Sequence, residues 1–600
     1  MNKPTLSLFI SFLSISTLAQ EKLSVAEPLQ VSSKPLVSVQ QTGQDVSIAT
    51  NLISVPGVVV VVQGEAVGQS DLSIRGSSFS GAGLSLFGLS LGNAQTEHFN
   101  ADLPFPAWWF AQPVVLTGVQ QAEITEGHLT GTVNLVPMPI QNETILTGGI
   151  DNKDGYWGNG SAQHVIQHQN GSQTGVGVFA GYSEIPDVDF QDNNVKVARG
   201  GARYQHLNEH GQSDVLFGYQ DKSFGATGYY GVNPNLKAEE KTEDALLTGN
   251  WQSNDPDSAL TASILLRQFK DDYTLWLPTS LFNNQHTTRS IATQVGRNFL
   301  FSDTMNMITR FAADYEEIES NSLGDFSRYR VVATAIPEWQ LTDDINVSIG
   351  VKAEFLEDED FQLLPLARID YAMQNNLHAH AEISQSVRRP SYTELNYESP
   401  GSLGNTGLAL QKETAAELGI RFDALKNTSI QAIVFGYQTS DTVDWVRPDA
   451  TATRWMAENI GEVETIGTEL TFTQHLHETL DLSVSYTWMD KDSDESVYSS
   501  RYALDYAQNL VQVQLNWMPL PWMRVELSQL YRDQVPNALR TEGGHEQWLS
   551  NIACHFRIPH QDHIQFTLAS TNATKDDYRV YPGQDTVTNR RVSAALTMDW

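Results

Sequence analysis

Cysteine, basic residues and long apolar runs are all scarce in this chain of 600 residues. The one cysteine, Cys554, excludes an intramolecular disulfide framework and a cysteine-based zinc site. Lysine and arginine number 37 against 71 aspartate and glutamate residues, which gives a net charge of −34. Nucleic acids and anionic lipids are bound by basic surfaces, so this balance argues against both as partners.

Long hydrophobic segments are absent beyond the N-terminus. The longest apolar run there, Val58 to Val62, has the length of one short strand, whereas a membrane-spanning helix needs about 20 apolar residues. Mean hydropathy is −0.30 and charged residues make up 18% of the chain. This profile excludes a helical membrane protein. It does not exclude a membrane β-barrel, because the strands of such a barrel carry apolar residues only in alternation.

Catalytic motifs are missing as well. The sequence has no P-loop and no His-Glu-x-x-His zinc motif. The pentapeptide Gly88-Leu89-Ser90-Leu91-Gly92 has the spacing of a nucleophile elbow, but it lies in a glycine-rich hairpin with no helical periodicity after it. We therefore predict that the protein is not an enzyme.

The pattern that is present is the alternation of apolar and polar residues, and it is clearest at the end of the sequence. There, small or polar residues alternate with Val592, Ala594, Leu596, Met598 and Trp600. Successive side chains of a strand point to opposite faces, so this segment has one apolar and one polar face. A strand of this kind that ends on an aromatic residue is typical of a transmembrane β-barrel, although an edge strand of a soluble sandwich would look similar.

The same alternation recurs upstream, at residues 480–488, 511–517 and 564–568, where the polar partners are mostly serine, threonine, glutamine, asparagine and aspartate. Such residues suit a hydrated lumen better than a dry core between two sheets. Many consecutive strands of this type, with no helical periods between them, predict an all-β fold: a transmembrane antiparallel β-barrel of about 22 strands. A barrel of that width needs a plug in its lumen.

The composition and the strand pattern divide the chain into four predicted segments. Residues 1–19 read as a secretory signal peptide, with Lys3 as the positive region, a short apolar stretch and a cleavage site after Ala19. Residues 20–50 are polar and irregular and read as a periplasmic arm. Residues 51–140 are rich in glycine and short strands, and they predict a mixed α/β plug domain. Residues 141–600 form the predicted barrel.

With these segments in place, the chain resembles a TonB-dependent outer-membrane receptor. The arm carries a stretch similar to the TonB box of that family, Glu27-Pro28-Leu29-Gln30-Val31-Ser32-Ser33. A generic linker is the alternative reading of this stretch. In the plug, Asp71 to Gly76 resembles the family's strand ending in Ile-Arg-Gly, and Gly131 to Val136 resembles the strand that closes the plug. The plug-motif residues are therefore Arg75, Gly76, Gly131 and Asn134.

The barrel carries two further family-like stretches. Arg389 to Leu395, followed by Glu413, Glu417 and Gly419, resembles the family's Ala-Pro-x-x-x-Glu-Leu segment, and Asn459 to Leu470 resembles its Asn-x-Gly hairpin. The plug departs from the family in two places. The segment from Ala122 to Leu129 is shortened, and the usual Asp-Gly turn is replaced near Phe87-Gly88. The resemblance implies coupling to TonB, through a free strand that adds to a sheet edge of that partner.

One plug loop, Gln95 to Asn100, resembles a loop of a cobalamin-receptor-like branch of the family. The barrel stretches around Tyr229-Tyr230 and from Asp271-Asp272 to Asn284 resemble the same branch. Polar side chains at a plug apex would hydrogen-bond a ligand, or else satisfy the loop's own backbone. Exposed aromatics such as Trp276 and Trp445 would stack on a planar ligand, or else serve as interface anchors. The predicted ligand-binding residues are Gln95, Thr96, His98, Asn100, Tyr229 and Tyr230.

A calcium site is predicted at one acidic loop, from the spacing of Asp187, Asp189 and Asp192. A solvated acidic loop is the alternative in so acidic a protein. No other cofactor is expected.

The reading that these features favour is a receptor in the bacterial outer membrane that imports a large, scarce solute, either a cobalamin-like corrinoid or an iron chelate. Its expected partners are TonB, outer-membrane lipid and that small-molecule ligand, and no nucleic acid. Two alternatives remain at this stage: a passive porin or adhesin barrel, and a soluble secreted β-sandwich or propeller enzyme.

Overall fold

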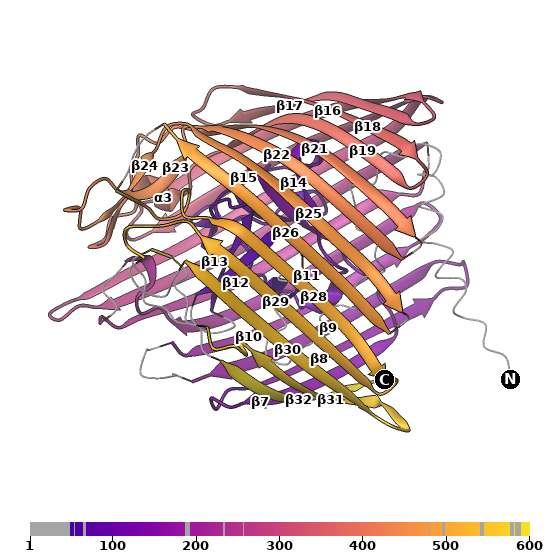
Figure 1. Cartoon of the computed structure of the whole chain (residues 1–600), viewed down its shortest axis with the longest axis horizontal. Helices are drawn as coiled ribbons and strands as arrows, with labels where there is room; N and C mark the ends of the chain where they lie inside the picture. Colours follow the sequence, from indigo (N-terminus) through magenta and orange to yellow (C-terminus); the bar gives the residue numbers. More distant parts are fainter. Residues whose placement is uncertain are drawn as a thin grey trace.

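The computed structural model of the chain describes residues 48–52, 55–63, 68–186, 193–231, 235–255, 257–425, 427–477, 479–494, 498–540, 545–576, 581–582 and 590–600. Twenty-two of the described strands close into one antiparallel barrel, drawn in Figure 1. The barrel strands are β7 (Glu143–Asp151), β8 (Tyr156–Gln167), β9 (Gln173–Ile185), β10 (Val195–Leu207), β11 (Gly211–Gly225), β12 (Ala238–Ser253), β13 (Ser258–Trp276), β14 (Leu281–Ser302), β15 (Met305–Ser320), β16 (Phe326–Thr342), β17 (Ile345–Leu356), β18 (Gln362–Gln374), β19 (Leu377–Arg388), β21 (Gln411–Leu425), β22 (Thr428–Ser440), β25 (Val463–His477), β26 (Leu480–Ser493), β28 (Ala507–Leu520), β29 (Met523–Gln534), β30 (Glu546–Ile558), β31 (Gln561–Thr571) and β32 (Arg591–Asp599).

The predicted alternation determines which side chains of each strand face outward and which face the lumen. In β32, Val592, Leu596 and Met598 are exposed on the outside of the barrel, and Ser593 and Thr597 are buried on the inside. The barrel closes where β32 pairs with β7, and there the Thr597 hydroxyl lies 3.0 Å from the hydroxyl of Thr147. The predicted barrel of about 22 strands is therefore confirmed, and its apolar outer face is the one that lipid would cover.

Short turns join the strands at one end of the barrel and long loops join them at the other, here called the turn end and the loop end. Strand β7 starts at the turn end, and the chain returns there after β32, where the backbone of Trp600 pairs with that of Thr144. Among the residues that the structure describes, no helix has the length and hydropathy needed to cross a bilayer.

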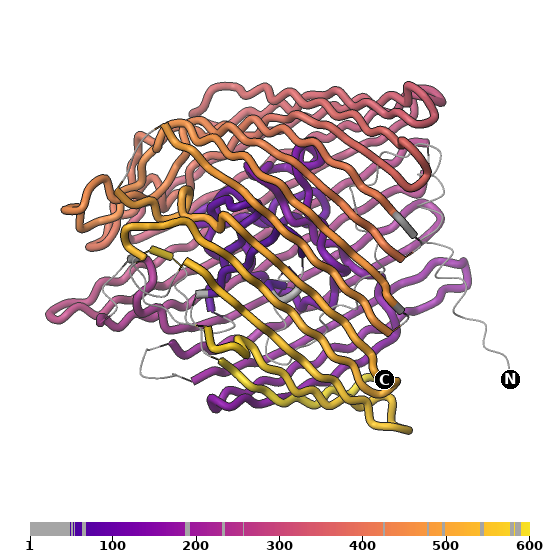
Figure 2. Tube along the Cα trace, viewed as in Figure 1, coloured from indigo at the N-terminus to yellow at the C-terminus, as the bar shows by residue number. Residues whose placement is uncertain are grey.

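The segment that precedes the barrel lies inside it, as the indigo trace in Figure 2 shows. Strands β1 and β2 form an antiparallel hairpin, and a mixed sheet has the order β4-β3-β6-β5. The described helices of this plug are short. Its elements are α2 (Ile48–Leu52), β1 (Val58–Gln63), β2 (Gln69–Ile74), β3 (Ala82–Leu86), β4 (Leu89–Ser90), η1 (Glu97–Phe99), η2 (Ala107–Trp109), β5 (Val114–Leu116), η3 (Gly118–Glu123) and β6 (Gly131–Leu135).

The two departures from the family pattern are accommodated locally. Phe87 and Gly88 both have positive φ angles, 57° and 78°, and form the tight turn between β3 and β4. The shortened segment after η3 leads into β6 within a few residues, and β6 still pairs in parallel with β3. The plug sheet therefore keeps its strand pairing despite the altered sequence.

The plug packs on one side of the barrel through apolar contacts. Phe105 and Trp109 share a buried cluster with Phe179 of β9, Leu216 of β11 and Leu246 of β12. Phe105 is fully buried. Burying side chains of this size contributes about 1.5–3 kcal/mol each, so this face is the plug's apolar anchor to the wall.

Three loops at the loop end fold inward over the plug. They contribute β20 (Ser402–Leu403), β23 (Val443–Arg447), β24 (Trp455–Asn459) and β27 (Ser499–Ser500), which form a sheet with the order β20-β24-β23-β27, together with the short helix α3 (Tyr392–Asn396). We call these four strands the loop sheet. Trp445 and Trp455 of the loop sheet share a buried cluster with Phe79 of the plug, so the sheet closes the lumen from the loop end.

Candidate functional site

A small cavity lies where the plug apex meets the loop sheet. Its volume is about 70 Å³, whereas sites for small molecules usually measure about 300–1,000 Å³. Four of the six predicted ligand-binding residues line it: Gln95, Thr96, His98 and Tyr230. The other lining residues are Phe79, Phe99, Glu240, Asp271, Tyr273, Asn284, His286, Ser391, Thr393, Glu394, Tyr397, Ser402, Trp445, Arg501 and Tyr502. We call this space the apex cavity.

His98 stands at the centre of the aromatic side of the apex cavity. Its ring stacks on Phe79 with a centroid distance of 3.7 Å and lies 5.7 Å from the ring of Tyr502. Its Nδ1 atom lies 2.9 Å from Oδ1 of Asp71, a buried carboxylate of β2. A second oxygen of Asp71 accepts a hydrogen bond of 2.5 Å from the hydroxyl of Tyr581. The plug apex, a plug strand and a barrel loop are thereby joined at one carboxylate.

The remaining two predicted ligand residues lie outside the lining. Asn100 is buried, and its Oδ1 accepts a hydrogen bond of 3.3 Å from the backbone of Asn93. Tyr229 packs in an apolar cluster with Phe224 and Phe269 of the barrel wall. Their positions fit the alternative roles, which are support of the loop's own backbone and packing against the wall.

Several polar atoms around the apex cavity find no hydrogen-bond partner among the described residues. They belong to buried side chains that are at most 5% exposed. We call them the open polar atoms: Oε1 of Gln95, Oδ1 of Asp271, Oδ1 of Asn284, the hydroxyl of Tyr273, and Nε and Nη2 of Arg501. A buried polar group without a partner costs about 1–3 kcal/mol. Their concentration around one cavity therefore indicates a site that a polar ligand would complete.

The family-like stretch Arg389 to Leu395 contacts the plug apex through backbone hydrogen bonds. Ser391 caps α3, and the Glu394 side chain accepts a hydrogen bond from the backbone N–H of Ser391. Arg388 pairs with Glu394 at 2.6 Å and with Glu97 of the plug at 3.1 Å. Burial raises the pKa of Glu97 to about 8, although Arg388 acts against that rise. The family-like stretch and the neighbouring Arg388 therefore connect the barrel wall to the plug loop that carries His98.

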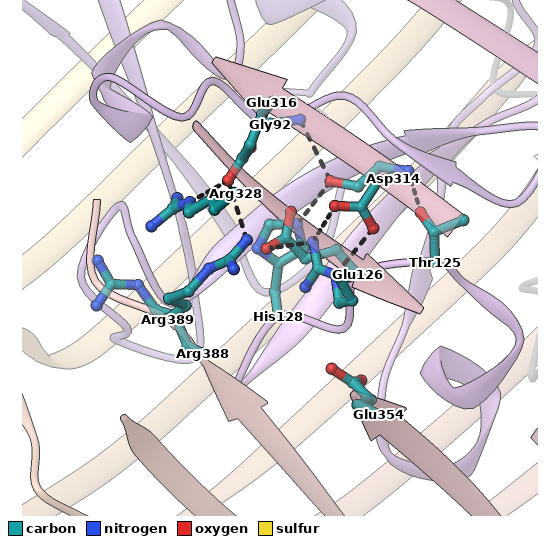
Figure 3. Close-up of polar contacts among 12 residues, drawn as sticks. Gly92, Thr125, Glu126, His128, Asp314, Glu316, Arg328, Glu354, Arg388 and Arg389 are labelled. Atoms are coloured by element: carbon teal, nitrogen blue, oxygen red, sulfur yellow. Dashed lines mark hydrogen bonds and ion pairs between the residues drawn. The ribbon is translucent and has the colours of Figure 1, made fainter. Parts of the chain in front are cut away.

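A second charged group surrounds the shortened plug segment, as Figure 3 shows. Glu126 and His128 project from the plug toward barrel residues, and Glu126 pairs with Arg330 at 2.9 Å. Burial alone would raise the pKa of Glu126, but Arg330, His128 and Arg389 outweigh it and bring it to about 2. Burial lowers the pKa of His128 to about 4. The plug is therefore held here by charge pairs, beside a small apolar cluster in which Val119 and Ala122 pack against the wall.

Arg75, a predicted plug-motif residue, forms ion pairs between the plug and strands β21 and β25 of the wall. It pairs with Glu417 and with Glu469, both at 2.7 Å, and donates to the hydroxyl of Tyr437 at 2.7 Å. Burial would lower the pKa of Arg75, but Glu417 and Glu469 hold it well above its usual value. Arg75 and the following Gly76 have φ angles of 49° and 68°, which turns the chain sharply after β2.

The other two plug-motif residues support the plug sheet. A Cβ atom on Gly131 would lie only 3.2 Å from atoms of Ile74, so the close approach of β6 to Ile74 favours glycine there. The Oδ1 atom of Asn134 accepts a hydrogen bond of 3.0 Å from Ser85 of the paired strand β3. These two motif residues therefore have structural roles within the plug.

Two larger cavities lie between the plug and the wall toward the turn end. Their volumes are about 390 and 270 Å³, and Gln120 of η3 and Arg368 of β18 line both. Both adjoin η3, and the larger one also reaches Phe87 of the plug and Asn250 and Gln252 of β12. Space for solvent is thus concentrated on the η3 side of the plug.

Three sets of predicted residues lie outside the described residues: the signal peptide 1–19, the TonB box Glu27 to Ser33, and the calcium loop with Asp187, Asp189 and Asp192. These stay predictions. Within the described ranges, no group of three or more histidine, cysteine, aspartate or glutamate residues is arranged to hold a metal ion.

The sequence did not single out several residues that line the apex cavity. Phe79, Arg501 and Tyr502 reach it from the plug and from a loop more than 400 positions further along the chain, and no local pattern marks them. Tyr273 has a detectable signal, because it faces inward near the loop end of β13, two positions after Asp271, which the resemblance had already marked. A search for inward-facing strand residues close to a long loop would have found Tyr273.

The barrel matches one family model. Residues 141–572 match the model described as TonB-dependent receptor-like, beta-barrel. No curated protein sequence matches the chain significantly.

Solved structures share the fold at low sequence identity. The ferric enterobactin receptor PfeA of Pseudomonas aeruginosa, solved as a mutant, has 12% identity and a TM-score of 0.73, over 92% of this chain and 96% of that chain. The ferric yersiniabactin uptake receptor FyuA of Yersinia pestis has 12% identity and a TM-score of 0.73, over 92% and 95%. The copper transporter OprC has 12% identity and a TM-score of 0.74, over 93% and 96%.

At such low sequence identity the solved structures establish the fold alone. The match to the family model establishes that the chain is a member of the family. The family consists of transport receptors and not of enzymes, which agrees with the absence of catalytic motifs. The chain belongs to the TonB-dependent receptor family and is a β-barrel protein of the bacterial outer membrane with an N-terminal plug in its lumen.

Proposed function

We propose that this receptor imports a large metal chelate, either a ferric siderophore or a corrinoid, and that its ligand docks at the apex cavity. The observation that carries the proposal is the set of open polar atoms beneath the loop sheet. Buried polar groups are normally hydrogen-bonded, and exceptions call for an explanation. A ligand that fills the cavity and bonds to Gln95, Asp271 and Arg501 supplies one.

The size of the cavity requires the loops to move. About 70 Å³ holds only a few water molecules and not a chelate. Trp445 of the loop sheet and Tyr502, which follows β27, cover the apex, so a ligand that enters from outside must first displace these side chains. Aromatic rings at the same place, including Phe79 and His98, offer planar surfaces against which an apolar part of the ligand would stack.

Import past the plug requires energy, and we assign the coupling to TonB. The outer membrane has no supply of nucleotides, so the work must come from a partner in the inner membrane. The proposed contact is the stretch Glu27 to Ser33 in the arm, which would add as a strand to a sheet edge of TonB.

The comparisons support a chelate as the cargo but do not choose among chelates. Two of the similar structures are named for ferric siderophores and one for copper. The corrinoid reading is supported by the loop from Gln95 to Asn100, four of whose side chains face or flank the apex cavity. A passive porin is disfavoured, because the plug bonds to the wall on several sides, for example at Lys222, Glu417 and Gln512.

The test is binding by the purified full-length protein in detergent. Cyanocobalamin, ferrichrome, ferric enterobactin and Cu²⁺ alone are titrated separately by calorimetry. We expect one chelate to bind, and Arg501→Ala to weaken that binding by about 5- to 150-fold. Lys412→Ala is a matched loss of a positive charge outside the apex cavity. Steady ion conductance in planar bilayers without binding of any chelate would contradict the proposal and favour a porin, and binding of Cu²⁺ alone would contradict a chelate.

A further inference from the structure

The charged groups around the apex cavity contain no excess of positive charge. Its lining includes three carboxylates, Glu240, Asp271 and Glu394, and one guanidinium, that of Arg501. Glu394 is already paired with Arg388 at 2.6 Å. Two carboxyl groups, those of Glu240 and Asp271, therefore face one guanidinium inside the cavity, and this set has no excess positive charge to offer a ligand with several negative charges.

Glu240 and Asp271 lie side by side on neighbouring strands. The Oε2 atom of Glu240 accepts a hydrogen bond of 2.7 Å from Tyr230, and Oδ2 of Asp271 accepts one of 2.5 Å from Gln95. The two carboxyl groups also interact with each other. Two carboxyl groups this close share one negative charge, because ionising both is unfavourable, and a hydrogen-bond donor or a cation brought by the ligand stabilises that charge.

Most of the open polar atoms on the wall and on the plug side are acceptors. The Gln95 amide nitrogen donates to Asp271, which fixes the orientation of that amide and leaves its oxygen as the open atom. Oδ1 of Asp271 and Oδ1 of Asn284 add two further acceptors. The open groups that can donate are the hydroxyl of Tyr273, which can also accept, and the guanidinium of Arg501, which belongs to the covering loop. A ligand that satisfies this wall must bring N–H or O–H groups to it.

The charge of the protein as a whole is negative. The chain carries a net charge of −34, and one loop at the loop end consists largely of acidic residues, Glu357, Asp358, Glu359 and Asp360. Long-range fields of one sign slow the approach of ligands with that sign and speed the approach of the opposite sign. A polyanion would therefore be disfavoured both on approach and on docking.

We infer that the ligand is an uncharged or cationic chelate that presents N–H or O–H donors to Gln95, Asp271 and Asn284, and that polyanionic chelates are rejected. This inference rests on the proposed function, since it specifies the ligand of the same site. It separates this receptor by charge class from a receptor for a ferric tris-catecholate, which carries three negative charges.

The test is a charge series of probes titrated against the full-length protein in detergent. Ferrioxamine B is a cation, ferrichrome and cyanocobalamin are uncharged, and ferric enterobactin is a trianion. We expect at least one of the first three to bind at least about 10-fold more tightly than the trianion. Asp271→Asn removes the negative charge with little change in shape, so it should reduce that preference at least about 5-fold.

Asp272→Asn is the matched control. It is the same substitution one position along β13, on the opposite face, where Asp272 accepts hydrogen bonds from Asn283 and Gln285. The preference should be unchanged in this variant. Tightest binding of the trianion would overturn the inference and leave the proposed function standing, and so would equal effects of the two substitutions. Failure of every probe to bind would contradict both.

Discussion

His98 of the plug apex and Asp71 of β2 lie 2.9 Å apart, from Nδ1 to Oδ1, and both side chains are buried. His98 lines the apex cavity, whereas Asp71 belongs to the strand that pairs with β1, where it lies opposite Val61. Strand β1 follows α2, which is the first described element after the arm. One hydrogen bond thus connects the ligand side of the plug with the hairpin nearest to the arm.

The first prediction concerns this pair. Asp71→Ala and His98→Ala should each weaken binding of the ligand by about 1–3 kcal/mol, because each removes a partner from a buried hydrogen bond. The double variant should be weaker by less than the sum, with a coupling energy of at least about 0.5 kcal/mol. Titration of the four proteins with the same probe measures this coupling. Strictly additive losses would mean that Asp71 does not position His98.

The second prediction concerns the buried cation Arg75. Arg75→Ala leaves Glu417 and Glu469 buried without their partner, which costs about 3–5 kcal/mol. We expect the plug to dock less firmly, so that planar bilayers show frequent opening and cells become permeable to large antibiotics. The triple variant Arg75→Met, Glu417→Gln, Glu469→Gln removes the charges together and should restore much of the closure. A closed Arg75→Ala barrel would contradict this role.

The third prediction concerns pH and His128. Its folded pKa is about 4, below the ordinary value near 6.5, because burial disfavours the charged form. Between pH 4 and pH 6.5, His128 is protonated when the plug has left the wall and its side chain is in water, and it is neutral when the plug is packed against the wall. Docking is therefore unaffected above about pH 6.5 and is weakened as the pH falls to 4, by up to about 3 kcal/mol.

Hydrogen exchange of residues 118–135 at a series of pH values measures the effect. His128→Gln should remove it, and the difference between the two proteins isolates His128 from Glu97, whose raised pKa acts in the opposite direction. Parallel pH profiles for the wild-type protein and His128→Gln would be inconsistent with this assignment.

The fourth prediction concerns the outer face of the barrel. Leu596 is exposed on β32 opposite Gly148 of β7, so Leu596→Arg places a charge in lipid at a cost of about 1–4 kcal/mol, depending on depth. We expect slower assembly and a lower temperature for the change in gel mobility on heating. Leu596→Met keeps the apolar surface and serves as the control. Unchanged behaviour of Leu596→Arg would place this face away from lipid.

The barrel could be predicted from the sequence because its signal is local. Alternation along β32 needs no knowledge of distant residues, and Val592 and Ser593 face opposite sides as the pattern requires. Gln512, a polar residue between two apolar ones, points inward, and its amide nitrogen donates to the backbone of Val58 in the plug. Because side chains alternate between the two faces of a strand, such a pattern by itself indicates which residues face inward.

The candidate site could be predicted only in part. The loop from Gln95 to His98 was identified through a resemblance, and it does line the apex cavity. Arg501 and Tyr502 were not identified, because their place depends on how three separate loops fold over the plug to form the loop sheet. Contacts of this kind connect residues hundreds of positions apart, and no pattern of hydrophobicity or spacing records them.

The central claim, energised import of a chelate, is tested most directly by uptake in whole cells. Cells that produce the receptor are given the labelled chelate that the purified protein binds, and accumulation is compared for the wild-type protein, Leu29→Pro and Leu29→Val. A proline removes the backbone N–H that strand addition to TonB needs, whereas valine keeps it. We predict that Leu29→Pro binds the chelate at the surface and accumulates none, while Leu29→Val accumulates it normally. Equal accumulation by all three would contradict TonB-coupled import through this arm.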